Sequence, residues 1–329
     1  MKELTVKERD AGGRLDKFLK HYLPDATTGF LYKMLRKKNI LLNGKKAEGK
    51  ELLRAGDVIR IYFSDETMEK FRGEPKENTE GPKPGFEIPV LYEDEEYLFF
   101  DKPAGLLSQK ASAGDYSLAE YLLDYLRKEG ALSAEEESSF TPAPAHRLDR
   151  NTSGIVACGK TRRGLQYLSK ALKERSLNKE YLCILKGDFK DFGPVNGYLK
   201  KDEEQNLASY SERPKEGYQK VAIEVLPEKE FALCKKEHGA SVVRIKLLTG
   251  KTHQIRAQLS ALGHPILGDP KYGDKALNES LKKLGIRRQL LHAYRIGFPK
   301  EAPGKLSGRE ITAPLPNDLS TMIAGKGIA

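Results

Sequence analysis

The N-terminal part of the chain carries two stretches with the hydrophobic spacing of amphipathic helices. Apolar residues recur at helical intervals over residues 15–23 and again over residues 30–38, where Lys and Arg occupy the opposite face. Asn43-Gly44 is then typical of a tight hairpin turn, and the β-prone run 58–63 follows it. The pattern predicts one unit of two helices and a small sheet at residues 12–63.

The composition changes after this unit. Residues 64–86 are rich in Glu, Lys, Pro and Gly and poor in large apolar side chains, so we expect a flexible linker that does not fold alone. Residues 87–329 hold short β-prone runs, at 88–103, 154–160, 180–187, 220–226 and 241–250, which alternate with two helical patterns, at 117–128 and 163–173. A chain of 329 residues also exceeds the usual size of one hydrophobic core. The predicted fold class is α+β, with a small N-terminal domain, a linker and a large mixed-sheet domain.

The charge of the chain favours a polyanionic partner. The sequence has 57 Lys and Arg against 47 Asp and Glu, which gives a formal net charge of +10. Such an excess attracts nucleic acid more than acidic or neutral molecules. An ordinary basic protein would show the same excess, so charge alone leaves both interpretations open.

Cysteine use and hydropathy bear on the compartment. Cys158, Cys183 and Cys234 are odd in number and widely spaced, which fits a reducing environment better than a disulfide framework. The N-terminus has no apolar core of signal-peptide length, and no run of about 18 apolar residues occurs in the sequence. We therefore expect a cytoplasmic protein that does not span a membrane.

The segment HRLDRNTSG at residues 146–154 is the most informative for chemistry. It places Asp149 between Arg147 and Arg150 in a loop of turn-forming residues, and an apolar strand follows at once. Cations close to a carboxylate favour its ionised form, which is the form that a nucleophile requires. An aspartate in a surface ion pair would have the same spacing, so the spacing does not decide between the two.

This segment resembles the catalytic signature of the RluA-type family of pseudouridine synthases. Lys251 stands where that family more often has Arg, so a flexible ammonium replaces a planar fork there. The stretch from Arg14 to Phe63 resembles an S4-type RNA-binding domain, an α/β unit whose helix pair lays basic side chains along an RNA backbone. Further similarities occur in the family's order at DKPAGL (101–106), Lys179-Glu180-Tyr181, LTGKTHQIR (248–256), GHPILGD (263–269) and Tyr272-Gly273.

The resemblance implies an isomerase that converts uridine to pseudouridine in structured RNA and needs no cofactor and no metal. In this interpretation Asp149 is the catalytic carboxylate, and Arg147 fills the gap that a flipped uridine leaves in the RNA. Tyr181 stacks on the flipped uracil, and Arg256 pairs with the catalytic carboxylate. Core packing of Tyr181 and surface solvation of Arg256 are the alternatives. Whether Asp149 attacks ribose C1′ or uracil C6, or assists a glycal route, stays open.

The S4 resemblance also implies RNA contacts in the N-terminal unit, although basic residues on an outer helix face are often only solvated. We expect large-subunit ribosomal RNA as the partner, with tRNA as the alternative, and a monomeric protein. The related RsuA-like family also carries an S4 domain, but His146 and the HQIR run at 253–256 favour the RluA type. The expected RNA-binding residues are Arg14, Lys17, Lys33, Arg36 and Lys37.

Three competing interpretations need weighing. Residues 154–161 fit the P-loop pattern G-x-x-x-x-G-K-[ST], but a turn precedes the first Gly and a strand-like run replaces the flexible cradle, so we do not expect nucleotide binding. Cys234 and His238 have the spacing of zinc ligands but lack a second close pair. A ribosome-assembly factor that binds RNA without modifying it would tolerate the loss of Asp149, which is present here.

Overall fold

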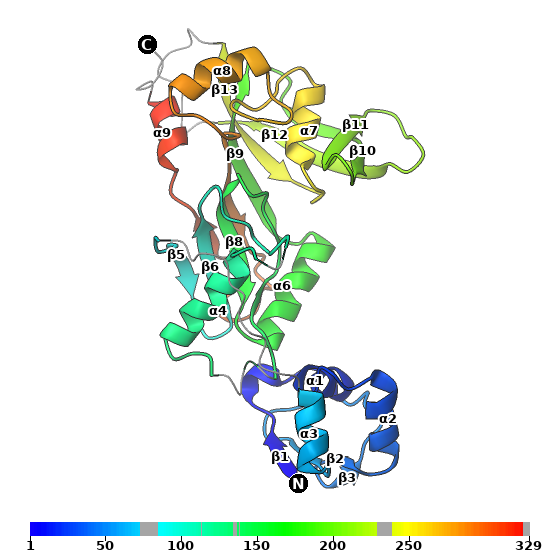
Figure 1. Cartoon of the computed structure of the whole chain (residues 1–329). Helices are drawn as coiled ribbons and strands as arrows, with labels where there is room; N and C mark the ends of the chain where they lie inside the picture. Colours follow the sequence, from blue (N-terminus) through cyan, green and yellow to red (C-terminus); the bar gives the residue numbers. More distant parts are fainter. Residues whose placement is uncertain (73–84, 113, 134–136, 138, 229–238, 325–329) are drawn as a thin grey trace.

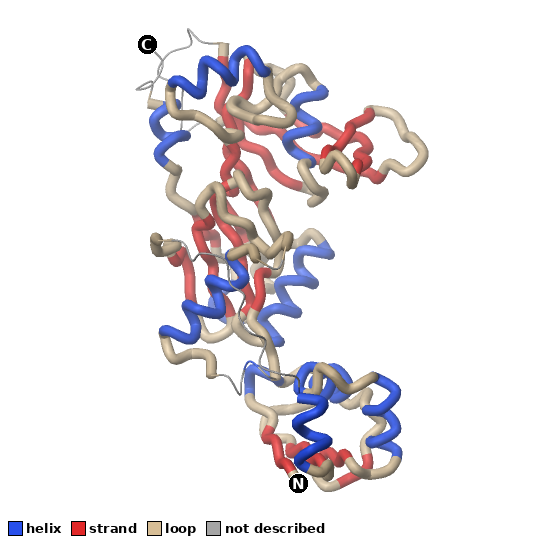
Figure 2. Tube along the Cα trace, in the orientation of Figure 1, coloured by secondary structure: helices blue, strands red, loops and turns tan. Residues whose placement is uncertain are grey.

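The computed structural model describes residues 1–324 except 73–84, 113, 134–136, 138 and 229–238. The molecule is elongated, with a small N-terminal domain at one end and a larger body built along one long sheet (Figure 1). The helices of the larger body pack beside this sheet (Figure 2). Within the described part of the chain, no helix combines the length and the apolar character needed to cross a membrane.

The N-terminal domain packs two helices on a four-stranded antiparallel sheet of order β1-β4-β2-β3. Its helices coincide with the two predicted amphipathic stretches, whose apolar faces meet the sheet in one core that includes Leu15, Leu31 and Ile59. The elements are β1 (Lys2–Thr5), η1 (Glu8–Asp10), α1 (Leu15–Tyr22), α2 (Thr28–Arg36), β2 (Ile40–Leu42), β3 (Lys45–Lys46) and β4 (Val58–Ile61).

The predicted hairpin turn joins β2 to β3. Asn43 and Gly44 have φ values of 51° and 73°, which is the left-handed pair that a two-residue type I′ turn requires. The Asn43 side chain donates to Asp57 Oδ1 at 2.8 Å and accepts from the Val58 amide at 2.8 Å. The turn is therefore fastened to the start of β4.

The segment 64–86 is not a linker over its whole length. Helix α3 (Asp65–Arg72) begins inside it, and Met68 and Phe71 pack against the N-terminal core. The ring of Phe71 lies 4.5 Å from that of Phe30, centroid to centroid. The prediction was wrong here because two apolar residues three positions apart are enough to fix a short helix on an existing core. Residues 73–84 of the predicted linker lie outside the described residues.

The larger body contains the mixed sheet that the sequence predicts. The strand order is β11-β10-β12-β13-β9-β14-β8-β6-β5, with β15 beside β14 and β7 beside β8. The β14–β8 pair is parallel, and the other pairs are antiparallel. The strands are β5 (Val90–Glu93), β6 (Tyr97–Lys102), β7 (Ala143–Pro144), β8 (Ser153–Gly159), β9 (Asn178–Lys186), β10 (Gly193–Asp202), β11 (Leu207–Ser211), β12 (Gln219–Pro227), β13 (Ala240–Leu247), β14 (Leu291–Gly297) and β15 (Glu310–Thr312).

Strands β6 and β8 are buried on both faces, because helices cover the sheet from two sides. Leu98 and Phe100 of β6 face a core that contains the apolar side of α4, whereas Tyr97 and Phe99 face a second core that contains α6. This alternation is what the two-residue period of a strand produces. The helices of the body are α4 (Leu118–Lys128), α6 (Arg162–Glu174), α7 (Gln254–Ala261), α8 (Lys275–Lys283) and α9 (Asn317–Ile323), with a short turn η3 (Gly304–Leu306).

The N-terminal domain rests on the larger body next to α6. Asp10 is buried there and accepts a hydrogen bond from the Ser139 hydroxyl at 2.9 Å. Arg162 of α6 donates to the Ser139 carbonyl at 3.0 Å and stacks over Phe140. A Cβ added to Gly13 would lie 2.5 Å from Arg162 Cδ, so glycine at this position permits the close approach of the two domains.

Candidate active site

The loop that carries Asp149 runs from β7 to β8 and is fastened by backbone contacts on both sides of this residue. Ser108 Oγ donates to the Leu148 carbonyl at 3.0 Å and accepts from the Leu148 amide at 2.9 Å. The Thr152 amide donates to the Asp149 carbonyl at 3.0 Å. These bonds fix the backbone around Asp149 while its carboxylate stays accessible, with the side chain 24% exposed.

Lys102 holds the same loop through hydrogen bonds to backbone carbonyls. Its side chain is fully buried, and Nζ donates to three carbonyl oxygens, including that of Arg150 at 3.1 Å. Burial, and then the positive charge of Arg288, lower the pKa of Lys102 to about 7. The loop after β6, at residues 103–106, is therefore tied to the Asp149 loop through one lysine.

Arg256 bridges Asp149 to a second carboxylate. Its Nη1 lies 2.9 Å from Asp149 Oδ2, while Nε and Nη2 donate to Asp269 at 2.7 and 2.8 Å. Burial by itself would lower the pKa of Arg256, but the hydrogen bond and charge of Asp269, together with Asp149, raise it. Arg256 is 4% exposed, so the alternative of a solvated surface arginine is excluded. The planar fork fixes where the Asp149 carboxylate lies.

His253 lies on the other side of the carboxylate, at the start of α7. Its Nε2 is 4.0 Å from Asp149 Oδ2, and Nδ1 is 2.9 Å from Tyr272 Oη. Tyr272 Oη accepts from the Ala208 amide at 2.6 Å, so its own proton is free to point at His253 Nδ1. That bond places the ring proton on Nε2, facing Asp149. Burial lowers the pKa of His253, which favours this neutral form.

Tyr181 stands on β9 above the same space. It is 8% exposed and lines the cavity together with Asp149. Burial, and then the negative charge of Asp149, raise the pKa of Tyr181 above its usual value. Its hydroxyl is therefore protonated at neutral pH and can donate a hydrogen bond. Tyr181 is thus more than a core residue, because its side chain also lines the cavity.

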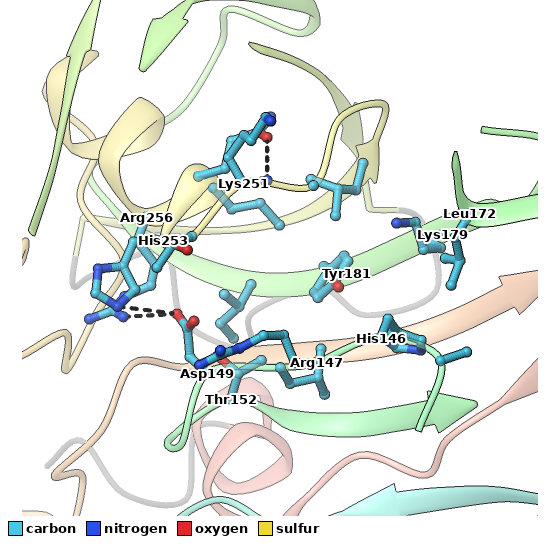
Figure 3. Close-up of a pocket in the computed structure, with 18 residues that line it drawn as sticks. His146, Arg147, Asp149, Thr152, Leu172, Lys179, Tyr181, Lys251, His253 and Arg256 are labelled. Carbon is cyan, nitrogen blue, oxygen red and sulfur yellow. Dashed lines mark hydrogen bonds and ion pairs between the residues drawn. The ribbon is translucent and has the colours of Figure 1, made fainter. Parts of the chain in front are cut away.

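These residues surround a cavity of about 340 Å³. Figure 3 shows Asp149 with Arg256 and His253 at one end, Lys179 and Leu172 at the other, and Arg147 and Tyr181 between them. Arg147 is exposed, and its side chain makes no hydrogen bond or ion pair with the residues that the structure describes. A cation that lines a cavity without a partner is available to a ligand.

His146 lines the cavity and connects the Asp149 loop to the sheet. Its Nε2 accepts a hydrogen bond from the Ala157 amide of β8 at 3.1 Å. Burial, and then the positive charge of Lys179, lower the pKa of His146 to about 3. The ring is therefore neutral and holds the beginning of the Asp149 loop against the sheet.

The structure thus brings together Arg147, Asp149, Tyr181 and Arg256, which the sequence interpretation had selected. It places the five basic residues of the N-terminal domain elsewhere, on exposed helix faces. Arg14 is paired with Asp16 at 2.7 Å, so part of its charge is neutralised. The other four, Lys17, Lys33, Arg36 and Lys37, are exposed.

The two competing motifs do not form sites in the described structure. Residues 154–159 of the P-loop pattern lie within the buried strand β8, so they form no cradle for a phosphate. Cys234 and His238 lie outside the described residues. Among the residues that are described, no group of three or more His, Cys, Asp and Glu side chains is arranged to hold a metal ion.

Four residues of the site received no role from the sequence. These residues, Lys102, His253, Asp269 and Tyr272, each lie in a segment with family resemblance, and this was the available signal. Spacing could not reveal their function, because Asp269 meets Arg256 only after the chain has turned back from α7. Lys102 donates to backbone carbonyls, and the sequence does not reveal which backbone carbonyls a lysine will contact.

Comparison with known proteins identifies the class to which this fold and site belong. Residues 96–261 match the model of the RNA pseudouridylate synthase family. The chain belongs to this family and is an RNA pseudouridine synthase, an isomerase. This confirms the predicted resemblance and activity.

Its relatives cover nearly the whole chain. It is 30% identical over 324 residues to ribosomal large subunit pseudouridine synthase C of Vibrio parahaemolyticus, covering 98% of this chain and 95% of that protein. The protein of the same name from Escherichia coli is 29% identical over 327 residues, covering 97% and 94%. The RluA-type assignment is thereby confirmed.

Solved structures support the fold. Human RNA pseudouridylate synthase domain containing 4 superposes with a TM-score of 0.55 at 20% identity, covering 71% of this chain and 91% of that one. Human RNA pseudouridylate synthase domain containing 1 gives a TM-score of 0.52 at 22% identity, covering 71% and 86%. At this identity the similarity concerns the fold alone.

Proposed function

We propose that this protein converts specific uridines of large-subunit ribosomal RNA to pseudouridine, with Asp149 as its catalytic carboxylate. The observation that carries the proposal is the buried chain Asp149–Arg256–Asp269, which ends in an accessible carboxylate inside a cavity of about 340 Å³. A purely structural ion pair would have no reason to expose one carboxylate to a cavity with an aromatic wall.

The names of the relatives support ribosomal RNA as the substrate, because the similar proteins are called large-subunit synthases and match over nearly their full length. A tRNA substrate is the alternative within the family. A non-catalytic assembly factor is disfavoured, because the residues expected to carry out catalysis line one cavity.

The cavity suits one extruded base. A uridine inside structured RNA must leave its stack before a carboxylate can reach it, at a cost of a few kcal/mol. Arg147 lies at this cavity, exposed and without a partner among the described residues, and its flat guanidinium would replace the base in the stack. Tyr181 would stack on the flipped uracil, a contact of about 1–3 kcal/mol.

The reaction needs no net redox change. The bond between uracil N1 and ribose C1′ breaks, a bond between C5 and C1′ forms, C5 loses a proton and N1 gains one. Asp149 would act as the ionised nucleophile or base, held in place by Arg256. Attack at C1′, attack at C6 and a glycal route all begin from this carboxylate. The raised pKa of Tyr181 makes its hydroxyl a donor in each route.

The N-terminal domain would act as an S4-like RNA-binding module. Its helices α1 and α2 expose Lys17, Lys33 and Arg36 to solvent, and Lys37 at the end of α2 is exposed as well. Such cations bind an RNA backbone by releasing its counterions. We infer that the protein is a monomer. Light scattering of the purified protein would show one chain per particle if this is correct. Fluorescent tagging in cells would test the proposed cytoplasmic location.

Mapping of pseudouridines in total RNA from cells with and without this protein tests the substrate. We expect one or a few large-subunit ribosomal uridines to lose modification in the deleted cells and to regain it when the gene is restored. Sites lost from tRNA instead would support the alternative substrate. Unchanged maps in every RNA class would contradict the proposal.

A further inference from the structure

Lys179 is an unpaired cation next to the active-site cavity. It lies on β9, is partly buried, and burial lowers the pKa of its ammonium group. No hydrogen bond or ion pair connects it to any residue for which the structure gives a position. A sequestered charge without a counter-charge is costly, so its presence in a cleft suggests that a ligand provides the missing anion.

The neighbours of Lys179 do not neutralise it. Glu180 follows it along β9, but its side chain faces the other side of the sheet and meets Arg244 at 3.5 Å. His146 lies close enough for the positive charge of Lys179 to lower its pKa, so its ring is neutral and provides no counter-charge. Tyr181 lies on the same face of β9, about 7 Å further along the strand. Lys179 therefore lies roughly one side-chain length from the ring proposed to hold the uracil.

A second cavity continues from the first at this point. It has a volume of about 330 Å³ and shares Leu172, Lys179, Leu247 and Gly250 with the active-site cavity. Arg175, the residue that ends α6, lines it as well and makes no side-chain bond among the described residues. Among the described residues that line the two cavities, Asp149 is the one carboxylate.

We propose that this second cavity is a binding site for a backbone phosphate of the RNA, next to the flipped uridine, with Lys179 as its principal ligand and Arg175 at its rim. The inference rests on the proposed function and names a subsite of it. The negative end of the α6 dipole also points here and would weaken anion binding to a small extent. Three cations, Lys179, Arg175 and Lys246, line this cavity and no carboxylate does, which outweighs that effect.

A phosphate fits this place better than the uracil does. Asp149 and Arg256 lie at the opposite end of the first cavity in Figure 3, and a base that reaches Asp149 lies on Tyr181 rather than beyond it. The sugar-phosphate chain must then leave the cavity past Tyr181. An ammonium group suits a phosphodiester as a point charge, so Lys179→Arg should retain much of the binding.

The experiment compares purified wild type with Lys179→Met and Lys179→Arg on an RNA fragment that the wild type modifies. For Lys179→Met we expect KM to rise about 10-fold or more, kcat to stay within about 3-fold, and the slope of log KM against log salt to fall by about 0.7 to 0.9. Lys179→Arg should restore most of the KM. Lys283→Met, an exposed lysine at the end of α8, is the matched control and should behave as the wild type.

A neutral methylphosphonate, placed in turn at each linkage flanking the target uridine, identifies the phosphate. One position should weaken binding to the wild type and have no further effect in Lys179→Met. An equal effect in both proteins at every position would overturn the inference, as would a loss of kcat with unchanged KM, which would place Lys179 on the reacting base. If the wild type modifies no RNA at all, the proposed function fails instead.

Discussion

Asp269 determines what Arg256 can do for Asp149. Asp269 is fully buried and takes two of the guanidinium bonds, which leaves Nη1 to meet the Asp149 carboxylate. A buried pair of this kind contributes little net stability, but removing one partner costs about 3–5 kcal/mol because the other charge is left alone. The geometry of Asp149 thus depends on a residue that does not line the cavity.

We expect Arg256→Lys to lose activity even though the positive charge is kept. An ammonium group cannot donate to Asp269 in two bonds and still reach Asp149, so kcat/KM should fall at least about 100-fold, and the free energy of unfolding by about 2 kcal/mol or more. Steady-state kinetics and urea unfolding measure both. Arg287→Lys, at an exposed position, is the control. Wild-type kcat/KM in Arg256→Lys would contradict the role of the planar fork.

His292 predicts a pH dependence of stability. It is fully buried, and Ser153 Oγ, at the start of β8, lies 2.9 Å from its Nδ1. Burial, and then the charge of Arg288, lower its pKa to about 4, against about 6.5 in an unfolded chain. Between these values only the unfolded chain takes up the proton, so the stabilisation is full above pH 6.5 and is lost as the pH falls toward 4.

The expected contribution is about 1.4 kcal/mol of unfolding free energy per pH unit within that window. Urea unfolding at several pH values should therefore show a steeper decline for the wild type than for His292→Asn. Parallel curves for the two proteins between pH 6.5 and 4 would show that His292 does not titrate as the structure implies.

At the scale of elements, the parallel pair β8–β14 supports the loop that carries Asp149. Gly154 has a φ of +110°, and a Cβ there would lie 2.3 Å from the Ala293 carbonyl oxygen of β14. The glycine that ends HRLDRNTSG is therefore required by the close approach of two backbones. The close approach therefore gives a physical reason for the glycine at the last position of the motif.

Gly154→Ala should destabilise the protein by about 3 kcal/mol or more, because neither backbone can yield without breaking the ladder. Gly29→Ala is a contrasting control, since Gly29 lies in α2 with open space around it. Helix propensity predicts that this control stabilises the protein by up to about 1 kcal/mol. Thermal unfolding of both variants checks the pair, and a neutral Gly154→Ala would refute the close approach.

The elements that the sequence predicted are those with strong periodicity. The helices at 15–23, 30–38, 117–128 and 163–173 agree with the structure, as do the β-prone runs that became β6, β8, β9, β12 and β13. Strands β10 and β11 were not predicted, because they are largely polar and half exposed, so their alternation is weak. Strand β14, which lies between β9 and β8, was not predicted either, because its place in the sheet depends on strands that are distant in the sequence.

The candidate site was predictable to the extent that it is written in contiguous motifs. Asp149, Arg147, Tyr181 and Arg256 lie in such segments and meet at one cavity. Contacts formed by tertiary folding, such as Arg256 with Asp269 and Lys102 with the Arg150 carbonyl, have no local signature. The unpaired state of Lys179 is likewise a property of the folded chain.

For the whole molecule, the N-terminal domain is docked as well as tethered. Asp10, Ser139 and Arg162 connect it to the larger body, and α3 extends its core to Arg72. The hydrophobic cores of the two parts have no residue in common. Each part therefore has its own core, and a deletion should end at residue 72 rather than 63.

Deletion of residues 1–72 should leave kcat within about 3-fold of the wild type on a short RNA fragment that contains the target uridine. The same deletion should raise KM for intact ribosomal RNA about 10-fold or more. The combined replacement of Lys33, Arg36 and Lys37 by Ala in the full chain should reproduce the higher KM without removing the domain. Unchanged KM in both proteins would show that the N-terminal domain does not bind the substrate.

The central claim is that the carboxylate of Asp149 is needed for the chemical step and not for holding RNA. Asp149→Asn keeps the shape of the side chain and a hydrogen-bond acceptor for Arg256 while it removes the charge. The decisive measurement is single-turnover pseudouridine formation by this variant, alongside its RNA affinity. The account predicts that the rate falls at least about 1,000-fold with Kd within about 3-fold of the wild type. Pseudouridine formation at a rate near that of the wild type would contradict it.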